Sequence, residues 1–460
     1  MVFNDGDPRI PGELRGPVER VVIVGAGIAG LTAANALAHH GIEAIVLEAR
    51  DRLGGRLHTI EIGGGPVDLG GSWIHEPVGN PLTAFAELAG VSRIPGDLFT
   101  DLQVLDPIDG LIAPLEAALL IEAASEGFAD AATGIAAELP AGASVADGID
   151  RFVATQAQLR GRVEPGRLRA VARNAAESDA SGRAEDIGLA HHPGNSLSYG
   201  GDYLGDLPSG GYRTIIEAMA GGLDVRLNAH VAELAVDDGG VHILTRDGAI
   251  VDGSHGLVTV PLGVLKSAGL RFDPPLPAER RSAIERLGFG RFEKVVLRFE
   301  RPFWSDAGVH HLLVVPHDGA PEIAVLTAMD RLGGGPVIVA FAFGSGAGCI
   351  ADPIESVVVG RVRDLLARAI GGPIDEPIEV VRTTWGSDPL TRGAYAYVSR
   401  ASAPADLDRL GQPLLGRLLF AGEATTSARV GFADGAMSSG IREAKRLLGR
   451  ADVLLGPLPG

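Results

Sequence analysis

The most regular hydrophobic pattern of the chain lies between residues 20 and 59. The apolar run at residues 20–24 predicts a buried strand, and the uncharged, alanine-rich run that follows it predicts a helix. A second apolar run, which ends at Glu48, predicts another strand. Gly25, Gly27 and Gly30 separate the first strand from the helix. This order of elements predicts a βαβ unit with parallel strands.

Each part of this unit has a role in holding a dinucleotide. Gly25 permits a tight turn, Gly27 lets backbone N–H groups approach a pyrophosphate, and Gly30 lets the helix pack close to the strand. The helix N-terminus carries a partial positive charge that favours phosphate. Glu48 lies 18 residues after Gly30, near the spacing at which an acid accepts the ribose hydroxyls. The sequence therefore predicts a dinucleotide site, and residues 54–56 (Gly-Gly-Arg) extend it.

The remaining pattern predicts a two-domain α/β protein whose nucleotide-binding domain is built from separated segments. Residues 82–205 are rich in alanine and leucine with helical spacing at 111–124 and 159–175, which predicts a helical cap. Strands are expected at 223–228, 230–236, 255–260, 294–299, 337–343 and 417–420, and helices at 214–220, 353–370 and 435–448. The predicted nucleotide-binding segments are 18–81, 206–288 and 406–450; the cap at 82–205 and a sheet at 289–405 form the second domain; 1–17 and 451–460 are flexible tails.

Composition and charge narrow the class of protein. The chain has 460 residues, of which 46% are hydrophobic and 21% charged, as in soluble globular proteins. Its formal net charge of −18 argues against binding to nucleic acid or an anionic membrane. That charge suits a cationic substrate, and it equally suits a solvated acidic surface. Cys349 is the only cysteine, so an internal disulfide and a cysteine zinc site are excluded, and a cytoplasmic location is expected.

Neither a membrane span nor a targeting segment is expected. Residues 21–38 form an uncharged run that a hydropathy window would flag as membrane-spanning, but its glycine pattern favours a nucleotide-binding unit. The first 19 residues are polar and lack an apolar signal core, which predicts a loose leader without a targeting role. The 12 histidines form no metal-ligand pattern, and neither GxSxG nor HExxH occurs. The sequence therefore predicts neither a metal site nor hydrolase chemistry.

Five further motifs accompany the glycine-rich turn. They are Asp68-Leu-Gly-Gly-Ser-Trp-Ile-His75, Val260-Pro-Leu-Gly-Val-Leu-Lys266, Phe292-Glu-Lys294, Trp385-Gly-Ser-Asp-Pro-Leu-Thr-Arg-Gly-Ala-Tyr395, and Phe420-Ala-Gly-Glu423 with the later Asp434-Gly-Ala-Met-Ser-Ser-Gly440. In this order they resemble the flavin-dependent amine oxidase family, which includes monoamine oxidases, polyamine oxidases and lysine-specific histone demethylases. The resemblance runs from about Arg20 to Leu448 and is weakest at residues 100–200.

The resemblance implies a Rossmann-like FAD-binding domain of the GR2 type, with a mixed-sheet substrate domain and a helical cap. Monoamine oxidases attach their flavin to a cysteine at the position of Ala394, so FAD is expected to be non-covalent here. The residues expected to hold it are Gly25, Gly27, Gly30, Glu48, Arg50, Gly55, Arg56, Gly71, Ser72, Trp73, Val231, Trp385, Gly422, Glu423 and Ala433.

The resemblance also implies a set of catalytic positions. Lys294 corresponds to a lysine that holds a water at flavin N5, although the alternating strand around it would by itself point a lysine to solvent. Tyr395 and Phe432 fall at the two positions of an aromatic cage that attracts and aligns the amine. His75 falls at a pocket position. Glu76 replaces a glycine of the family, so it either pairs with a distal ammonium or is a loop charge.

The function expected from these residues is FAD-dependent oxidation of an amine. A hydride passes from the α-carbon to flavin N5, the imine is hydrolysed, and O₂ is reduced to H₂O₂. The segment Arg392–Tyr397 favours a polyamine or a related amine as substrate. An alternative substrate is a bulky biosynthetic intermediate, which the divergent cap would receive. An alternative function is that of a regulatory or structural protein that binds FAD without catalysis. The expected partners are a small amine and O₂, and a homodimer is one possible assembly.

Overall fold

The nucleotide-binding turn is carried by a five-stranded parallel sheet. The computed structural model of the chain describes residues 2–3, 14–96, 101–156, 159, 161–192, 199–201, 204–315 and 323–458. The strand order is β10-β3-β2-β14-β23, and all neighbouring pairs run parallel. The strands are β2 (Arg20–Val24), β3 (Glu43–Leu47), β10 (Asp224–Arg226), β14 (His255–Val258) and β23 (Leu418–Phe420).

Both faces of this sheet are covered, which explains why its strands are apolar throughout. Helices α1 (Ile28–His39), α7 (Tyr212–Ala220) and α13 (Ala433–Leu448) share one hydrophobic core with its first face. A four-stranded sheet of order β13-β12-β11-β15 packs on the second face. Its strands are β11 (Val231–Val236), β12 (Val241–Thr245), β13 (Ile250–Gly253) and β15 (Arg271–Asp273).

Helices α1 and α13 pack unusually closely, because a glycine lies at their contact. A Cβ atom at Gly440 would lie 2.4 Å from the carbonyl oxygen of Ala29. The C-terminal helix is therefore fitted against the helix that begins at the glycine-rich turn, and it brings its own N-terminal residues to the same region.

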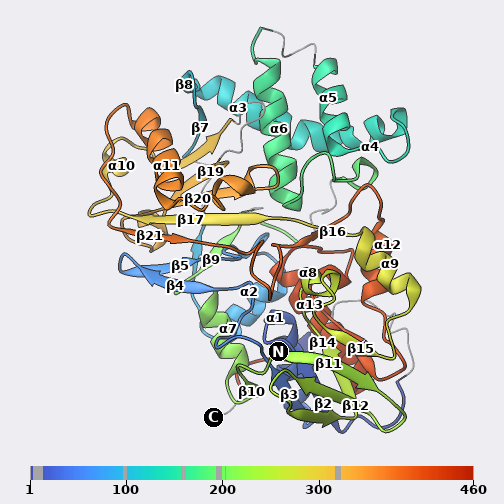
Figure 1. The fold of residues 1–460 in the computed structure, drawn as a ribbon. Coiled ribbons are helices and arrows are strands. Elements are labelled where there is room, and N and C mark those ends of the chain that lie inside the picture. Colours follow the sequence, from blue (N-terminus) through green and yellow to red (C-terminus); the bar gives the residue numbers. More distant parts are fainter. Residues whose placement is uncertain are drawn as a thin grey trace.

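A seven-stranded mixed sheet lies above the nucleotide-binding sheet in Figure 1, in the order β21-β17-β20-β19-β18-β7-β8. Its strands are β7 (Leu102–Asp106), β8 (Gly110–Leu111), β17 (Phe292–Arg298), β18 (His311–Val314), β19 (Val325–Ala328), β20 (Val337–Phe343) and β21 (Glu379–Arg382). Helix α11 (Glu355–Ile370) packs on it. Strand β17 is buried from residue 293 to residue 297 because both of its faces are covered.

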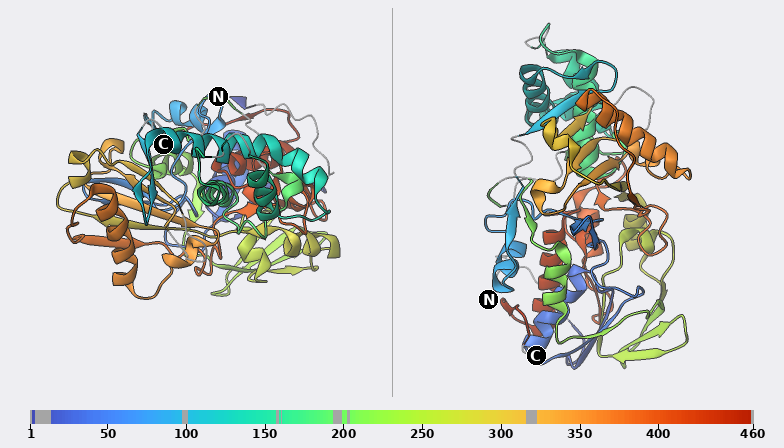
Figure 2. Two further views of the ribbon diagram at one scale, coloured as in Figure 1. Left: turned by 90° about the horizontal axis from the view of Figure 1, so that it is seen from above. Right: turned by 90° about the vertical axis from the view of Figure 1, so that its left-hand side faces the viewer.

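The cap is formed by helices at the upper end of the molecule, and the side view of Figure 2 keeps this order of layers. These are α3 (Pro114–Glu122), which continues through a π turn at Ala123–Gly127, α4 (Phe128–Glu138), α5 (Val145–Thr155) and α6 (Pro165–Ala180). The cap at 82–205 was predicted to be largely helical, and strands β7 and β8 at 102–106 and 110–111 are not part of that prediction. The reason is long-range pairing, because β7 runs parallel to β18 of the later sheet.

Shorter elements connect these layers. The strand pairs are β4 (Thr59–Ile62) with β5 (Gly65–Asp68), β6 (Arg93–Pro95) with β9 (Asp206–Pro208), and β16 (Gly288–Phe289) with β22 (Ala396–Tyr397). The remaining helices are α2 (Pro81–Leu88), α8 (Leu262–Lys266), α9 (Ala278–Arg286), α10 (Phe303–Asp306) and α12 (Pro404–Leu410), with 3₁₀ turns at Leu189–His191, Asp330–Leu332, Gly346–Cys349 and Glu423–Thr425.

The prediction of a flexible tail at 451–460 is wrong for residues 453–456, which the structure describes. Val453 and Leu455 are buried in the core of the nucleotide-binding sheet, and β24 (Val453–Leu454) pairs with β1 (Val2–Phe3). The side chain of Asn35 donates to the Gly456 carbonyl at 3.0 Å and accepts from its N–H at 3.2 Å. Apolar burial and this amide pair hold the segment. Of the expected tail at 1–17, residues 1 and 4–13 lie outside the described part of the chain.

Among the helices of the described ranges, none combines the length and the apolar character that a membrane span requires.

Candidate active site

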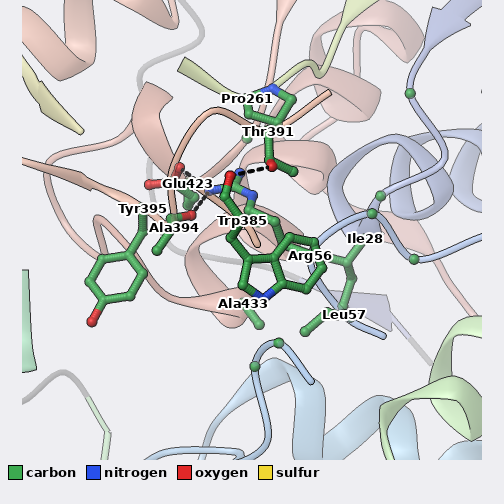
Figure 3. A pocket seen from close by; sticks show the side chains of 18 of the residues that line it. Ile28, Arg56, Leu57, Pro261, Trp385, Thr391, Ala394, Tyr395, Glu423 and Ala433 are labelled. Carbon is green, nitrogen blue, oxygen red and sulfur yellow. Dashed lines mark hydrogen bonds and ion pairs between the residues drawn. The ribbon is translucent and has the colours of Figure 1, made fainter. Parts of the chain in front are cut away.

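A cavity of about 390 Å³ lies where the two large sheets meet. It is lined by the glycine-rich turn, the end of β3, the loop after β5, the last turn of α6, strands β11 and β17, and the N-terminus of α13. Figure 3 shows Arg56, Trp385 and Tyr395 gathered around it. Of the residues predicted for the site, all line this cavity except Gly30 and Glu76.

The three glycines of the turn occupy three different environments. Gly25 has a φ of +111°, and a Cβ atom there would lie 2.6 Å from Oγ1 of Thr259. A Cβ at Gly30 would lie 2.1 Å from the carbonyl oxygen of Gly25, so Gly30 serves the packing of helix on strand. A Cβ at Gly27 would meet no described atom within 4 Å, and it would project into open space beside the cavity. This geometry fits a dinucleotide whose pyrophosphate approaches the backbone at Gly27.

The carboxylate of Glu48 is fixed at the end of β3. Its Oε2 accepts the N–H of Ala26 at 2.8 Å, and its Oε1 accepts the N–H of Arg50 at 2.8 Å. Each carboxylate oxygen can accept a second hydrogen bond, so the group is able to receive ribose hydroxyls. Arg50 in turn forms an ion pair with Asp388 at 2.7 Å, which joins this end of the cavity to the loop after Trp385.

Arg56 and Glu423 form an ion pair across the cavity wall. Arg56 Nη1 lies 2.8 Å from Glu423 Oε1, and it also donates to the carbonyl of Ala394. The other carboxylate oxygen of Glu423 accepts the N–H groups of Ala396 and Gly431 at 3.2 Å each. Arg56 and Glu423 are 367 positions apart in the sequence. Their contacts join the segments around residues 56, 394–396 and 423–431 of the lining, and Figure 3 shows Arg56, Ala394 and Glu423 together.

Lys294 is buried, with 3% of its surface exposed. Its Nζ donates to three acceptors at 2.7 Å each, which are the carbonyls of Asp68 and Gly70 and the Oγ of Ser72. The alternating pattern alone would have pointed this side chain to solvent, but β17 is covered on both faces. Burial lowers the pKa of Lys294 to about 8, because the charged ammonium is poorly solvated there. Burial likewise raises the pKa of the nearby Asp68 carboxyl to about 6.

The residue next to Lys294 organises the Trp385 segment. Oε2 of Glu293 accepts the N–H of Trp385 at 3.0 Å, and Oε1 accepts the N–H of Gly386 at 2.8 Å. The indole Nε1 of Trp385 then donates to the carbonyl of Leu69 at 3.0 Å. Lys294 and Trp385 therefore contact the three consecutive carbonyls of residues 68–70, and this fixes the loop that contributes Ser72 and Trp73 to the cavity.

Tyr395 and Phe432 both line the cavity, together with His75. The phenol of Tyr395 donates to the carbonyl of Ser178 at the end of α6, and burial raises its pKa well above the usual value. The rings of His75 and Phe432 meet edge to face, with centroids 5.1 Å apart. The end of α6 is itself anchored, because Glu177 accepts the N–H and the hydroxyl of Ser345 at 2.7 Å each.

The expected pocket role of Glu76 is not supported by its position. Glu76 is buried, does not belong to the cavity lining, and forms an ion pair with Arg429 at 2.6 Å. Arg429 also pairs with Asp434 at 2.7 Å. The backbone of Glu76 has a φ of +47°, so the chain turns sharply after His75, which does line the cavity. Glu76 is therefore a buried loop residue held in an ion pair, and it does not line the cavity.

Several residues of the site carry no signal in the sequence. Arg429 pairs with the distant Glu76, Thr259 donates to the distant carbonyls of residues 24 and 25, and Ser178 contributes a backbone carbonyl. Glu293 stands inside a recognised motif, but its contacts with the Trp385 segment are visible only in three dimensions. Asp68 stands inside a recognised motif, but its burial beside the Lys294 contact is visible only in three dimensions.

Comparison with known proteins agrees with this geometry. The sequence model of the family described as flavin containing amine oxidoreductase matches residues 28–448. The chain therefore belongs to this family, whose members carry FAD, and the open space at Gly27 and the carboxylate of Glu48 fit that cofactor.

Individual relatives carry two kinds of name. The chain is 34% identical to lysine-specific histone demethylase 1 homolog 2 of Arabidopsis thaliana, over 97% of this chain and 60% of that protein. It is 31% identical to polyamine oxidase 4 of Oryza sativa subsp. japonica, over 93% of this chain and 89% of that protein. The chain thus spans 60% or less of the length of the demethylase homologues that it matches.

A solved structure of a putrescine oxidase double mutant, redesigned in cofactor binding, superposes with a TM-score of 0.75. The superposed region covers 94% of this chain and 100% of the putrescine oxidase chain, at 22% sequence identity. This likeness supports the fold.

Proposed function

We propose that this protein oxidises an amine with FAD as the bound oxidant and O₂ as the final electron acceptor. The observation that carries the proposal is the position of Lys294, which is buried in the lining of one cavity together with Tyr395, Phe432 and the dinucleotide turn. In this arrangement the amine would be bound between the aromatic walls, beside the turn that would hold the nucleotide. When bound, FAD supplies the hydride acceptor.

The residues of this chain would bind the cofactor and align the amine. The turn at Gly25–Gly30 and Glu48 would hold the nucleotide part of FAD, and Arg56 with Glu423 would border the part that leads to the ring. Tyr395, Phe432 and His75 would form the walls against which the amine is aligned, because aromatic faces attract cations and orient apolar chains. The buried wall excludes water from the reacting carbon. No side-chain nucleophile is needed.

The substrate class that we propose is a polyamine or a related aliphatic amine. Polyamine oxidases of rice and Arabidopsis align with more than nine-tenths of this chain and with 87–89% of their own length. The formal charge of −18 would attract a polycation over long range. A methylated lysine side chain is a competing substrate, because the demethylase homologues are 30–34% identical to the chain and the polyamine oxidases 31%. A bulky biosynthetic amine is another, because the resemblance to the family is weakest at residues 100–200.

Anaerobic mixing tests this proposal directly. The FAD-loaded protein is mixed without O₂ with spermine, spermidine, N-acetylated polyamines, aromatic amines and a dimethyl-lysine peptide, and the oxidised flavin band is followed. Loss of the band with a polyamine, and H₂O₂ release once air is admitted, are the expected results. Bleaching only by the peptide or by an aromatic amine would change the substrate class. Persistence of the band with the whole panel would refute the proposed oxidation and favour a non-catalytic flavoprotein.

A further inference from the structure

His75 and Phe432 form one continuous part of the cavity wall, although they lie far apart in the sequence. His75 belongs to the loop after β5, and Phe432 directly precedes α13. Both residues line the cavity, and their rings meet edge to face with centroids 5.1 Å apart. Such a ring contact contributes only about 0.5–1.5 kcal/mol. The two segments therefore need further contacts if this wall is to be rigid.

A buried guanidinium supplies these contacts from outside the cavity. Nη1 of Arg429 pairs with Glu76 at 2.6 Å, and its Nε pairs with Asp434 at 2.7 Å. No more than 5% of any of these three side chains is exposed. Glu76 directly follows His75 in the chain, and Asp434 belongs to the first turn of α13. Charge-assisted hydrogen bonds of this kind are short and directional, so Arg429 ties the loop after β5 to the start of α13.

The same guanidinium also contacts the wall itself, because it lies over the ring of Phe432. The residue before that ring is Gly431, where a Cβ atom would lie 3.1 Å from Cδ2 of Tyr395. The backbone there packs closely against the Tyr395 ring. The phenol of Tyr395 is held in turn by the Ser178 carbonyl. One buried cation thus fixes the relative positions of three aromatic side chains that line the cavity.

We propose that Arg429 is a positioning residue for the amine, which holds His75 and Phe432 in place without contacting the substrate. Arg429, Glu76 and Asp434 do not belong to the lining of the cavity. Under the proposed oxidase function, on which this part rests, the amine is aligned against these two rings before the hydride leaves its α-carbon. A displacement of about 1 Å in such a site can cost about 10²-fold in rate. Oxidation of the amine needs the wall, and the later reaction with O₂ does not.

Glu76→Gly cuts the tie and leaves a chain that should fold. Glu76 has a φ of +47°, a conformation that glycine adopts at little cost. The pair of Arg429 with Asp434 remains, so the buried guanidinium keeps a counter-charge. Glu138→Gly is the matched control, because it removes a solvent-exposed ion pair with Arg151 on the cap. Urea unfolding of both FAD-loaded variants checks that each is folded at the assay temperature.

Stopped-flow mixing then separates the two half-reactions. The reductant is spermidine, or whichever amine of the panel reduces the wild type, and the efficiency is the limiting rate divided by the apparent Kd. In Glu76→Gly this efficiency should fall at least about tenfold below that of the wild type and of Glu138→Gly, while the dithionite-reduced variant reacts with O₂ at the wild-type rate. Glu76→Asp restores a carboxylate beside Arg429 and should recover part of the loss. Wild-type efficiency in Glu76→Gly, or an equal loss in both half-reactions, would overturn the proposal.

Crystal structures of the FAD-bound wild type and of Glu76→Gly give a readout that is independent of turnover. We expect the His75 ring to keep its edge-to-face contact with Phe432 in the wild type, and to shift by about 1 Å or more in the variant. An unchanged contact in the variant would overturn the positioning role even if the protein oxidises amines. Failure of every amine to bleach the flavin would refute the proposed function, and the two crystal structures would still decide whether Arg429 holds the wall.

Discussion

The guanidinium carbon of Arg429 lies 4.1 Å from the ring centroid of Phe432. The same guanidinium is 5.1 Å from the ring centroid of Tyr199 and pairs with Glu76 and Asp434 along its edges. One face of a cavity-lining ring is therefore already covered by a buried cation. This changes the role expected of Phe432, because a ring that faces an arginine has less attraction left for an ammonium. Phe432 serves better as an apolar wall.

Replacement of Arg429 should strongly destabilise the protein. Arg429→Met leaves two buried carboxylates without their cation, which costs about 3–5 kcal/mol. Urea unfolding followed by circular dichroism measures this loss. The exposed pair Arg301–Asp306 supplies the control, because Arg301→Met should change the free energy of unfolding by less than about 1 kcal/mol. The triple change with Glu76→Gln and Asp434→Asn should recover most of the loss; no recovery would mean that charge is not the cause.

Two alanine substitutions in the glycine-rich turn should separate cofactor binding from folding. Gly27→Ala adds a methyl group that meets no described atom within 4 Å, so the apoprotein should unfold near the wild-type midpoint. Its affinity for FAD should fall at least tenfold, which is about 1.4 kcal/mol. Gly30→Ala places a methyl group 2.1 Å from the Gly25 carbonyl, and such overpacking should cost about 1–3 kcal/mol of stability. Equal effects of both changes on stability would contradict this assignment.

The buried ammonium of Lys294 predicts a pH dependence of stability with a definite sign. The pKa of this group is about 8 in the folded protein, against an ordinary value of 10.5 for a lysine in an unfolded chain. Between these values the unfolded chain binds more protons, so the stability of the wild type should rise with pH. Relative to Lys294→Met, the gain is on the order of 3 kcal/mol across the window. Urea unfolding at intervals from pH 7 to 10 measures it, and a constant difference between the two proteins would refute it.

The same substitution should slow the reaction of the reduced flavin with O₂ while FAD stays bound. Under the proposed function, Lys294→Met removes the proton source of the cavity, and a loss of about 10²-fold or more is expected. Lys266→Met is the control, because Lys266 is absent from the cavity lining and donates to the Glu285 carbonyl at 2.9 Å. Stopped-flow mixing with O₂ compares the two proteins. An unchanged rate in Lys294→Met would exclude that role.

Glu293 should prove to be a positioning residue for Trp385. In Glu293→Gln one of the two carboxylate oxygens becomes an amide NH₂, which faces donors rather than acceptors, at a cost of about 1–3 kcal/mol. The altered Trp385 loop should change the near-ultraviolet circular dichroism of the protein. Glu379→Gln is a suitable control, because Glu379 lies on β21 in an ion pair with Arg298 that is open to solvent. Identical spectra for Glu293→Gln and the wild type would argue against positioning.

Much of the fold was predictable because it depends on local patterns. The strand expected at 337–343 has these bounds in the structure, and the strand expected at 230–236 begins one residue later, at Val231. The βαβ unit at the glycine-rich turn forms as expected. Apolar runs and glycines carry their own structural preference, so such elements are readable without tertiary information. Strands β7 and β8 were missed because they are stabilised by a partner strand that comes much later in the chain.

The site was predictable where motifs specify it and not where packing does. The burial of Lys294 could not be deduced from an alternating strand, because the covering of both faces of β17 is a property of the whole fold. The pairing of Glu76 with Arg429 joins residues 353 positions apart, and the sequence holds no signal for it. The sequence left open whether Glu76 faces the pocket, and the structure places it outside the cavity lining.

The close contact of α1 with α13 has a consequence for how the protein matures. Glu423, Ala433 and the contact at Gly440 come long after the glycine-rich turn in the sequence, and they complete the same site as that turn. Pairing of such distant segments is slow, and the incomplete nucleotide sheet exposes apolar surface until it happens. A growing chain should therefore acquire its flavin only after residues 423–440 have been made and folded, so that FAD captures molecules with a complete sheet and shields them from degradation.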